Sequence, residues 1–166
     1  MSSQPTLTPQ LIHHFVQALM QTLRLLQQLE TTMLDETRAL ASRDPELLQQ
    51  IVIRKEALVH AVEQETLKQK QSVETAAYSF TPAGLAAFFA AGAAPQMVRE
   101  QWAQVCALGL RCAQLNQANA RLIEQDRKRI AGLLRILSGD DAPSATYTPQ
   151  GRTQSASSRS RTLIRA

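Results

Sequence analysis

The sequence predicts an all-α protein with an antiparallel helical hairpin, a long C-terminal helix in a coiled-coil-like bundle, a short Ala/Gly-rich helix between them, and a disordered C-terminal tail. Apolar residues recur at three- and four-residue spacing over long segments, which is the period of amphipathic helices. Aromatic residues are only 4% of the chain, and Gly and Pro cluster instead of recurring at short regular intervals as they do between strands. We expect one helical bundle domain over residues 1–137 and a flexible Ser/Thr/Arg-rich tail over residues 138–166.

The first two helices are predicted over residues 9–42 and 45–75. Thr8 is a candidate N-cap, and Pro9 fits the first helical position. Pro45 cannot continue the first helix but can begin the second, with Asp44 as its cap. Because the turn between these two long amphipathic segments is so short, the sequence predicts an antiparallel hairpin.

A short third helix is predicted over residues 82–93, where a few bulky apolar residues stand among Ala and Gly. It is too short to cross a membrane. A helix packed against the hairpin is the favoured interpretation. A mobile flap is the alternative, because Gly84 and Gly92 weaken a helix.

The last helix is predicted over residues 95–137, with Gly109 and Gly132 as candidate bend points. A helix of this length would reach about 65 Å, against roughly 45 Å for each arm of the hairpin. We therefore expect one end of the last helix to extend past the hairpin or to bend.

Several function classes are disfavoured by the sequence. No apolar run approaches the roughly 20 residues that span a bilayer, and no secretory signal is visible, so we expect a cytoplasmic protein without stable membrane insertion. Cys106 and Cys112 exclude a disulfide framework. No phosphate-binding loop, nucleophile elbow or zinc motif occurs, and the adjacent His13 and His14 point about 100° apart on a helix. We expect no enzymatic activity, no metal and no cofactor.

The net charge of +4 is concentrated in the last helix and the tail. A solvated helix face is the ordinary explanation, and an acidic partner or a nucleic acid is the alternative. Glu124 and Asp126 dilute the basic stretch, and no aromatic residues are interleaved with it, so we expect no nucleic acid partner. A basic nucleic-acid-binding helical protein would lose affinity steeply with salt. The basic residues of this stretch are Arg121, Arg127, Lys128, Arg129 and Arg135.

Polar residues interrupt the apolar stripes of the second and the last helix. Lys55 falls at a seam position of the second helix, and Glu30 and Glu36 lie on the opposing arm. Lys55 is either a snorkelling lysine or one half of an ion pair that fixes the register of the hairpin. Asn116 and Asn119 either restrict packing geometry from within a seam or face solvent.

The C-terminal half of the last helix carries a broad apolar face formed by Ile123, Ile130, Leu133, Leu134 and Leu137. An exposed apolar face with polar rims marks a partner site in many proteins, and an amphipathic helix laid against another helix is a standard mode of recognition. Alternatively, this face packs on the hairpin or self-associates, which would make the chain a structural coiled-coil protein.

Three segments of the chain, in order, carry a resemblance to a known family. They are the hairpin run from Leu26 to Val62, the run from Trp102 through Leu115-Asn116-Gln117-Ala118-Asn119-Ala120-Arg121-Leu122-Ile123-Glu124, and Tyr147-Thr148-Pro149-Gln150-Gly151-Arg152-Thr153 in the tail. Together they resemble the FlgN-type flagellar export chaperones, from about residue 10 to residue 165. The Ala/Gly-rich segment 82–94 departs from a minimal member of the family.

The resemblance implies a small cytoplasmic helical chaperone of the flagellar type III export pathway. Such proteins bind hook–filament junction proteins of the FlgK and FlgL type and deliver them to an export gate protein of the FlhA type. Their C-terminal helix binds the cargo, and a tyrosine in the following tail contacts the gate, which here implies Tyr147, with Gly151 close by. The implied cargo-binding residues are Leu115, Asn119, Leu122, Ile123, Ile130, Leu133, Leu134 and Leu137. The exact cargo set and the oligomeric state stay open.

Overall fold

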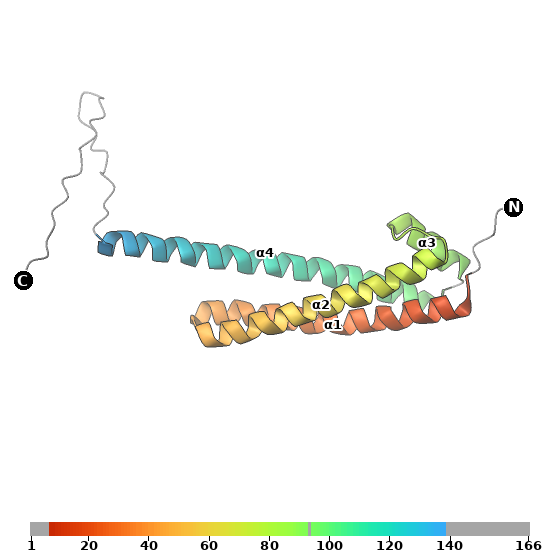
Figure 1. The fold of residues 1–166 in the computed structure, drawn as a ribbon, viewed down its shortest axis with the longest axis horizontal. Coiled ribbons are helices and arrows are strands. Elements are labelled where there is room, and N and C mark those ends of the chain that lie inside the picture. Colours follow the sequence, from red (N-terminus) through yellow and green to blue (C-terminus); the bar gives the residue numbers. More distant parts are fainter. Residues whose placement is uncertain (1–6, 93, 139–166) are drawn as a thin grey trace, which may run out of the picture. The chain divides into compact units, whose positions relative to one another are not determined.

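In a computed structural model, the chain forms four α-helices, described here for residues 7–92 and 94–138 (Figure 1). They are α1 (Pro9–Ser42), α2 (Pro45–Thr75), α3 (Pro82–Ala91) and α4 (Gln96–Ser138). The described residues contain no strand. Helices α1 and α2 form the hairpin, α3 is the short helix and α4 the long one, so the predicted all-α fold class is confirmed. The predicted tail lies outside the described residues, apart from its first residue, Ser138.

The chain divides into two compact units, Met1–Ile123 and Glu124–Ala166. Helix α4 begins in the first unit and ends in the second without a break in its helical residues. That residues 1–137 fold as a single domain stays a prediction.

The turn between α1 and α2 is made by two adjacent residues. Arg43 ends α1 in the left-handed conformation, with φ 57°, and Asp44 caps α2 by accepting a hydrogen bond from the Leu47 amide at 3.0 Å. Thr8 occupies the N-cap position of α1, but its side chain makes no capping hydrogen bond. The start of α1 therefore relies on Pro9, whose fixed φ suits the first helical turn.

The core of the first unit contains a cluster of aromatic rings. Phe15 of α1 is fully buried, and its ring centroid lies 5.3 Å from that of Phe88, 5.6 Å from that of Phe89 and 6.1 Å from that of Trp102. Aromatic pairs in such geometries add about 1 kcal/mol each to the burial of their surface. Because Leu85, Phe88 and Phe89 are all buried, α3 is the packed helix that the favoured interpretation predicts and not a flap.

Gly84 within α3 and Gly92, its C-cap, allow the close packing of this helix. A Cβ atom at Gly84 would collide with the carbonyl oxygen of Ser79, and one at Gly92 would lie 2.7 Å from a methyl carbon of Ile12. The sequence suggested that these glycines weaken the helix. The structure shows that they let its backbone approach the preceding loop and α1.

Candidate partner-binding face of helix α4

The first part of α4 belongs to the interior of the unit Met1–Ile123. Val98, Val105, Leu108 and Cys112 are each less than 10% exposed and join the core with side chains from α1, α2 and α3. Leu115, the first of the predicted cargo-binding residues, is half-buried and packs against this core. This part of the helix is therefore a structural element.

Asn119 is the predicted cargo-binding residue that the structure places in the interior. It is 1% exposed, and its amide nitrogen donates to the carbonyl oxygen of Met33 and to the carboxylate of Glu36, both at 2.9 Å. The hydroxyl of Thr37 donates to its amide oxygen at 2.7 Å. Because these contacts occupy the polar atoms of its amide, Asn119 attaches α4 to α1 and is not available at the surface. Asn119 therefore lies within a seam between helices and does not face solvent.

Glu36, which binds Asn119 of α4, also binds α2. Its carboxylate is fully buried and accepts a hydrogen bond from the ammonium of Lys55 at 2.6 Å, while the Lys55 side chain stays 18% exposed. Lys55 is thus paired, as the ion-pair interpretation requires. We call Glu36, Lys55, Asn119 and Thr37 the Glu36 network. It joins α1, α2 and α4, and a buried charge needs such partners because the loss of its hydration is otherwise uncompensated.

Glu30, the other candidate partner for Lys55, is bound to α4 instead. Its carboxylate accepts a hydrogen bond from the guanidinium of Arg111 at 2.6 Å. This hydrogen bond and the charge of Glu30 raise the pKa of Arg111, whose guanidinium is already charged at neutral pH. This pair could not be predicted from periodicity, because Arg111 stands outside the apolar stripe of α4.

The second part of α4 exposes its large aliphatic side chains. Exposed fractions are 53% for Ile130, 52% for Leu133, 60% for Leu134, 69% for Ile136 and 83% for Leu137. We call these five residues the α4 apolar face. Ile136 was missed by the sequence reasoning, although it follows Leu133 at the three-residue spacing of a helix face. Two more predicted residues, Leu122 and Ile123, lie in the first unit and are 40% and 45% exposed.

Basic side chains stand close to the α4 apolar face in the sequence. Glu124 lies 3.5 Å from the guanidinium of Arg127 and 3.8 Å from the ammonium of Lys128, at helical spacings of three and four residues. Both pairs are solvent-exposed, so they contribute at most about 0.5 kcal/mol each. The arrangement is that of a solvated helix with an apolar side.

The two cysteines differ in burial. The thiol of Cys112 is buried and lies 3.7 Å from the carbonyl oxygen of Leu26, and this burial raises its pKa. Cys106 is exposed, but partial loss of hydration also raises the pKa of its thiol. Both side chains therefore remain protonated at neutral pH and behave as ordinary thiols and not as activated nucleophiles.

Across residues 7–92 and 94–138, no three side chains of His, Cys, Asp or Glu are grouped so that they could hold a metal ion. The rings of His13 and His14 have centroids 6.4 Å apart on the exposed side of α1. Within the same residues, none of the helices combines the length and the apolar character that a membrane crossing needs. The predicted gate-contact residues, Tyr147 and Gly151, lie outside the described residues.

Comparison with protein families identifies a match over most of the chain. The family model of the FlgN protein matches residues 3–155, which is nearly the whole chain. No curated protein and no solved structure matches the chain. The match includes the hairpin, α3 and all of α4. The chain therefore belongs to the FlgN family, a family of flagellar export chaperones.

Proposed function

We propose that the chain is a cytoplasmic, non-enzymatic chaperone of flagellar type III export that binds hook–filament junction proteins of the FlgK and FlgL type. It holds these hook-associated proteins before secretion and delivers them to an export gate protein of the FlhA type. Membership of the FlgN family supports the chaperone role. The observation that carries the cargo site is the exposure of five large aliphatic side chains between Ile130 and Leu137.

The α4 apolar face suits a helical cargo. Each square ångström of apolar surface removed from water contributes about 25 cal/mol, so a cargo helix that covers this face gains affinity from burial alone. Aggregation-prone helical ends of cargo proteins need the same cover before secretion, and an amphipathic helix on another helix supplies it. Such a chaperone acts by stoichiometric binding and needs no cofactor.

The proposed cargo contacts follow the exposure of the side chains. They are Leu122, Ile123, Ile130, Leu133, Leu134, Ile136 and Leu137, with half-buried Leu115 at the start of the series. Asn119 acts on cargo only through the Glu36 network, which holds α4 in place. Tyr147 and Gly151 are proposed as the gate contact, on a part of the chain separate from the cargo site.

Two substitutions in the α4 apolar face test the cargo site. Leu133→Asp combined with Leu137→Asp places two charges where cargo would exclude water, so co-purification with a FlgK-type protein should be lost while circular dichroism shows unchanged helicity. The matched control combines Met97→Asp with Leu110→Asp, both 62% exposed on the first part of α4. The control should retain cargo. Retention of cargo by the first variant would place the cargo site elsewhere.

The gate contact is tested separately. Tyr147→Ala should weaken binding to the cytoplasmic part of an FlhA-type protein and leave cargo binding unchanged, because the two contacts use different parts of the chain. Binding of both partners is measured by the same co-purification assay. Loss of both together would contradict two separate contacts.

Self-association is the second candidate function, because the α4 apolar face could equally be covered by a second copy of the chain. Measurement of mass in solution separates the two candidates. A stable oligomer that buries Ile130 to Leu137 favours a structural coiled-coil protein. A monomer that forms a stoichiometric complex with a junction protein favours the chaperone.

A further inference from the structure

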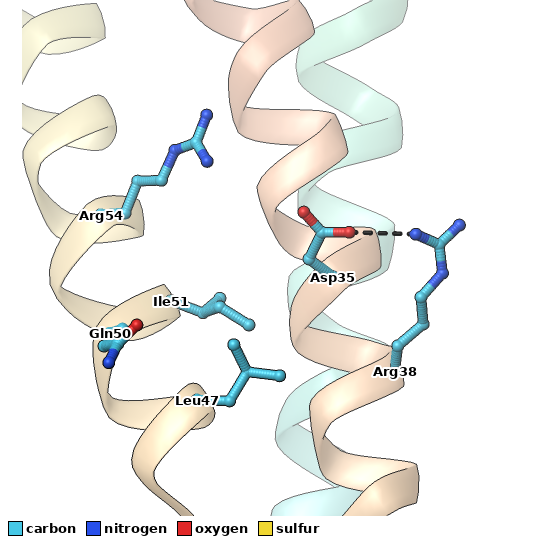
Figure 2. Close-up of a pocket in the computed structure, with 6 residues that line it drawn as sticks. All are labelled: Asp35, Arg38, Leu47, Gln50, Ile51 and Arg54. Atoms are coloured by element: carbon cyan, nitrogen blue, oxygen red, sulfur yellow. Dashed lines mark hydrogen bonds and ion pairs between the residues drawn. The ribbon is translucent and has the colours of Figure 1, made fainter. Parts of the chain in front are cut away.

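A groove lies between α1 and α2, next to the turn of the hairpin. Its volume is about 440 Å³, and all of it lies within the unit Met1–Ile123. A volume of this size accommodates one or two large side chains of a partner. Asp35 and Arg38 line it from α1, and Leu47, Gln50, Ile51 and Arg54 line it from α2 (Figure 2).

The floor of the groove is apolar. Figure 2 shows the side chains of Leu47 and Ile51, one helical turn apart, pointing from α2 toward α1. Ile51 is 8% exposed and completes the hairpin core, whereas Leu47 is 43% exposed and leaves much of its side chain in water. An incoming aliphatic side chain would cover Leu47 and rest on Ile51.

The rim of the groove is positively charged. Arg54 lies one turn beyond Gln50 on α2, and no carboxylate in residues 7–92 and 94–138 pairs with it (Figure 2). Asp35 and Arg38 pair with each other at 3.0 Å, with side chains 38% and 79% exposed, so this ion pair is weak and exchanges readily. Two arginines against one aspartate leave the lining with an excess of one positive charge.

We propose that this groove binds an acidic amphipathic helix of a partner polypeptide. One aliphatic side chain of that helix packs on Leu47 and Ile51, and a carboxylate about one turn away accepts hydrogen bonds from the guanidinium of Arg54. An arginine suits this role because its donors match both oxygens of a carboxylate. The proposal concerns a surface apart from α4 and does not rest on the cargo site.

Charge argues for another polypeptide over the chain itself. Residues 124–138, which include the α4 apolar face, contain four basic and two acidic side chains. Residues 139–166 contain four arginines and two aspartates, and their aliphatic pair Leu163 and Ile164 stands between Arg161 and Arg165. Either segment would bring further positive charge to Arg54, which disfavours its docking.

The test uses the full chain, labelled with ¹⁵N, and two short acetylated helical peptides. One peptide is built from leucine, alanine and glutamate, and its twin carries lysine in place of each glutamate. Addition of the glutamate peptide should shift the amide signals of Gln50, Ile51 and Arg54, and the lysine twin should not. Arg54→Ala should weaken binding about threefold, because an ion pair at an exposed arginine is lost. Leu47→Ser should weaken it about fivefold through lost apolar contact.

Two exposed positions outside the groove provide matched controls. Arg24→Ala removes an exposed arginine from α1, and Ile53→Ser removes a 60% exposed aliphatic side chain from α2. Both should bind the glutamate peptide as the parent chain does. Equal binding of the two peptides, or shifts confined to residues 122–137, would overturn the proposal.

Two other occupants of the groove, a second copy of the chain and the chain's own C-terminal segment, are tested without added peptide. Groove amide signals that move with protein concentration would identify a second copy as the occupant. Groove signals that move when Leu163→Ser and Ile164→Ser are introduced into the full chain would identify its own C-terminal segment. Either result would overturn the proposal, and constant signals in both experiments support it.

Discussion

Two parts of the same helix, α4, differ in what surrounds their apolar side chains. From Val98 to Asn119, side chains at helical spacing are buried against α1, α2 and α3. From Glu124 to Leu137, none of the described side chains is buried. The apolar period is continuous through both parts. Periodicity therefore identifies a face that can be covered but not the molecule that covers it.

Polar partners distinguish the two parts more clearly than apolar ones. In the first part, Arg111 pairs with Glu30 and Asn119 binds Glu36, so the polar atoms of α4 have acceptors on α1. In the second part, Glu124 pairs with Arg127 and Lys128 of its own helix. These two ion pairs lie within α4 itself, whereas those of Arg111 and Asn119 connect α4 to α1.

The largest effect is expected at the Glu36 network. Glu36→Leu removes the carboxylate that pairs with the ammonium of Lys55 and one of the two acceptors of the Asn119 amide nitrogen. It should lower the free energy of unfolding by about 4 kcal/mol. Urea unfolding followed by circular dichroism measures this loss. Glu124→Leu, in the second part of α4, is the control and should cost about 0.5 kcal/mol or less.

The double variant Glu36→Leu with Lys55→Met separates charge from packing. Replacement of a buried ion pair by apolar side chains is often neutral, so this variant should recover most of the lost stability. A double variant as unstable as Glu36→Leu alone would contradict the explanation by an unpaired buried charge.

The next largest effect on the unfolding free energy is expected when leucines in the two parts of α4 are replaced. Leu108→Ala empties a core position that is 5% exposed and should cost about 3 kcal/mol of unfolding free energy. Leu134→Ala removes a side chain that is 60% exposed and should cost about 0.5 kcal/mol or less. The same urea titration measures both. Equal losses would show that the α4 apolar face is covered within the chain.

Replacement of either of two glycines of α4 by alanine should have a smaller, stabilising effect. A Cβ atom at Gly109 or at Gly132 would meet no atom within 4 Å. Because alanine favours the helical state over glycine by about 1 kcal/mol, Gly109→Ala should raise the unfolding free energy by nearly that amount. Gly132→Ala should raise helicity but add less to global stability, since its segment contributes no buried side chain. A loss of stability at Gly109 would indicate a bend that the helix requires.

Thiol labelling reports burial without a change in stability. Cys106 should react with a thiolate-specific reagent before Cys112, because only Cys106 is exposed. The pKa of both thiols is raised, so the reactive thiolate is scarce at neutral pH, and the rate should grow as the pH rises toward about 9. In urea the two rates should converge. Equal rates in the folded protein would contradict the burial of Cys112.

Much of the fold could be predicted because the residues that begin its helices act through local backbone geometry. Pro9, Asp44, Pro45 and Pro82 mark helix starts through backbone geometry and capping, which need no tertiary information. An ion pair of Lys55 with the facing arm was also one of its two interpretations from the sequence. That Lys55 pairs with Glu36 and not with Glu30 could not be predicted. Both glutamates lie on the facing arm, and the offset between the arms is set by the turn at Arg43.

The candidate site was only partly predictable for the same reason. Asn119 and Leu122 stand three residues apart on one helix, yet Asn119 is 1% exposed and Leu122 is 40% exposed. Their difference depends on how α1 and α4 are aligned, because Asn119 is buried by its contacts with Met33 and Glu36 of α1. The groove at Leu47 and Arg54 also needed the structure, since it depends on the spacing between the two arms of the hairpin.

Hydrogen–deuterium exchange along α4, with and without a FlgK-type protein, tests most directly whether the α4 apolar face is free for a partner. In the protein alone, amides of residues 124–137 should exchange much faster than those of residues 98–119, because no buried side chain holds the former segment. Added junction protein should slow exchange in residues 124–137 and leave residues 98–119 unchanged. Strong protection of residues 124–137 in the protein alone, or no change there on cargo addition, would contradict the account.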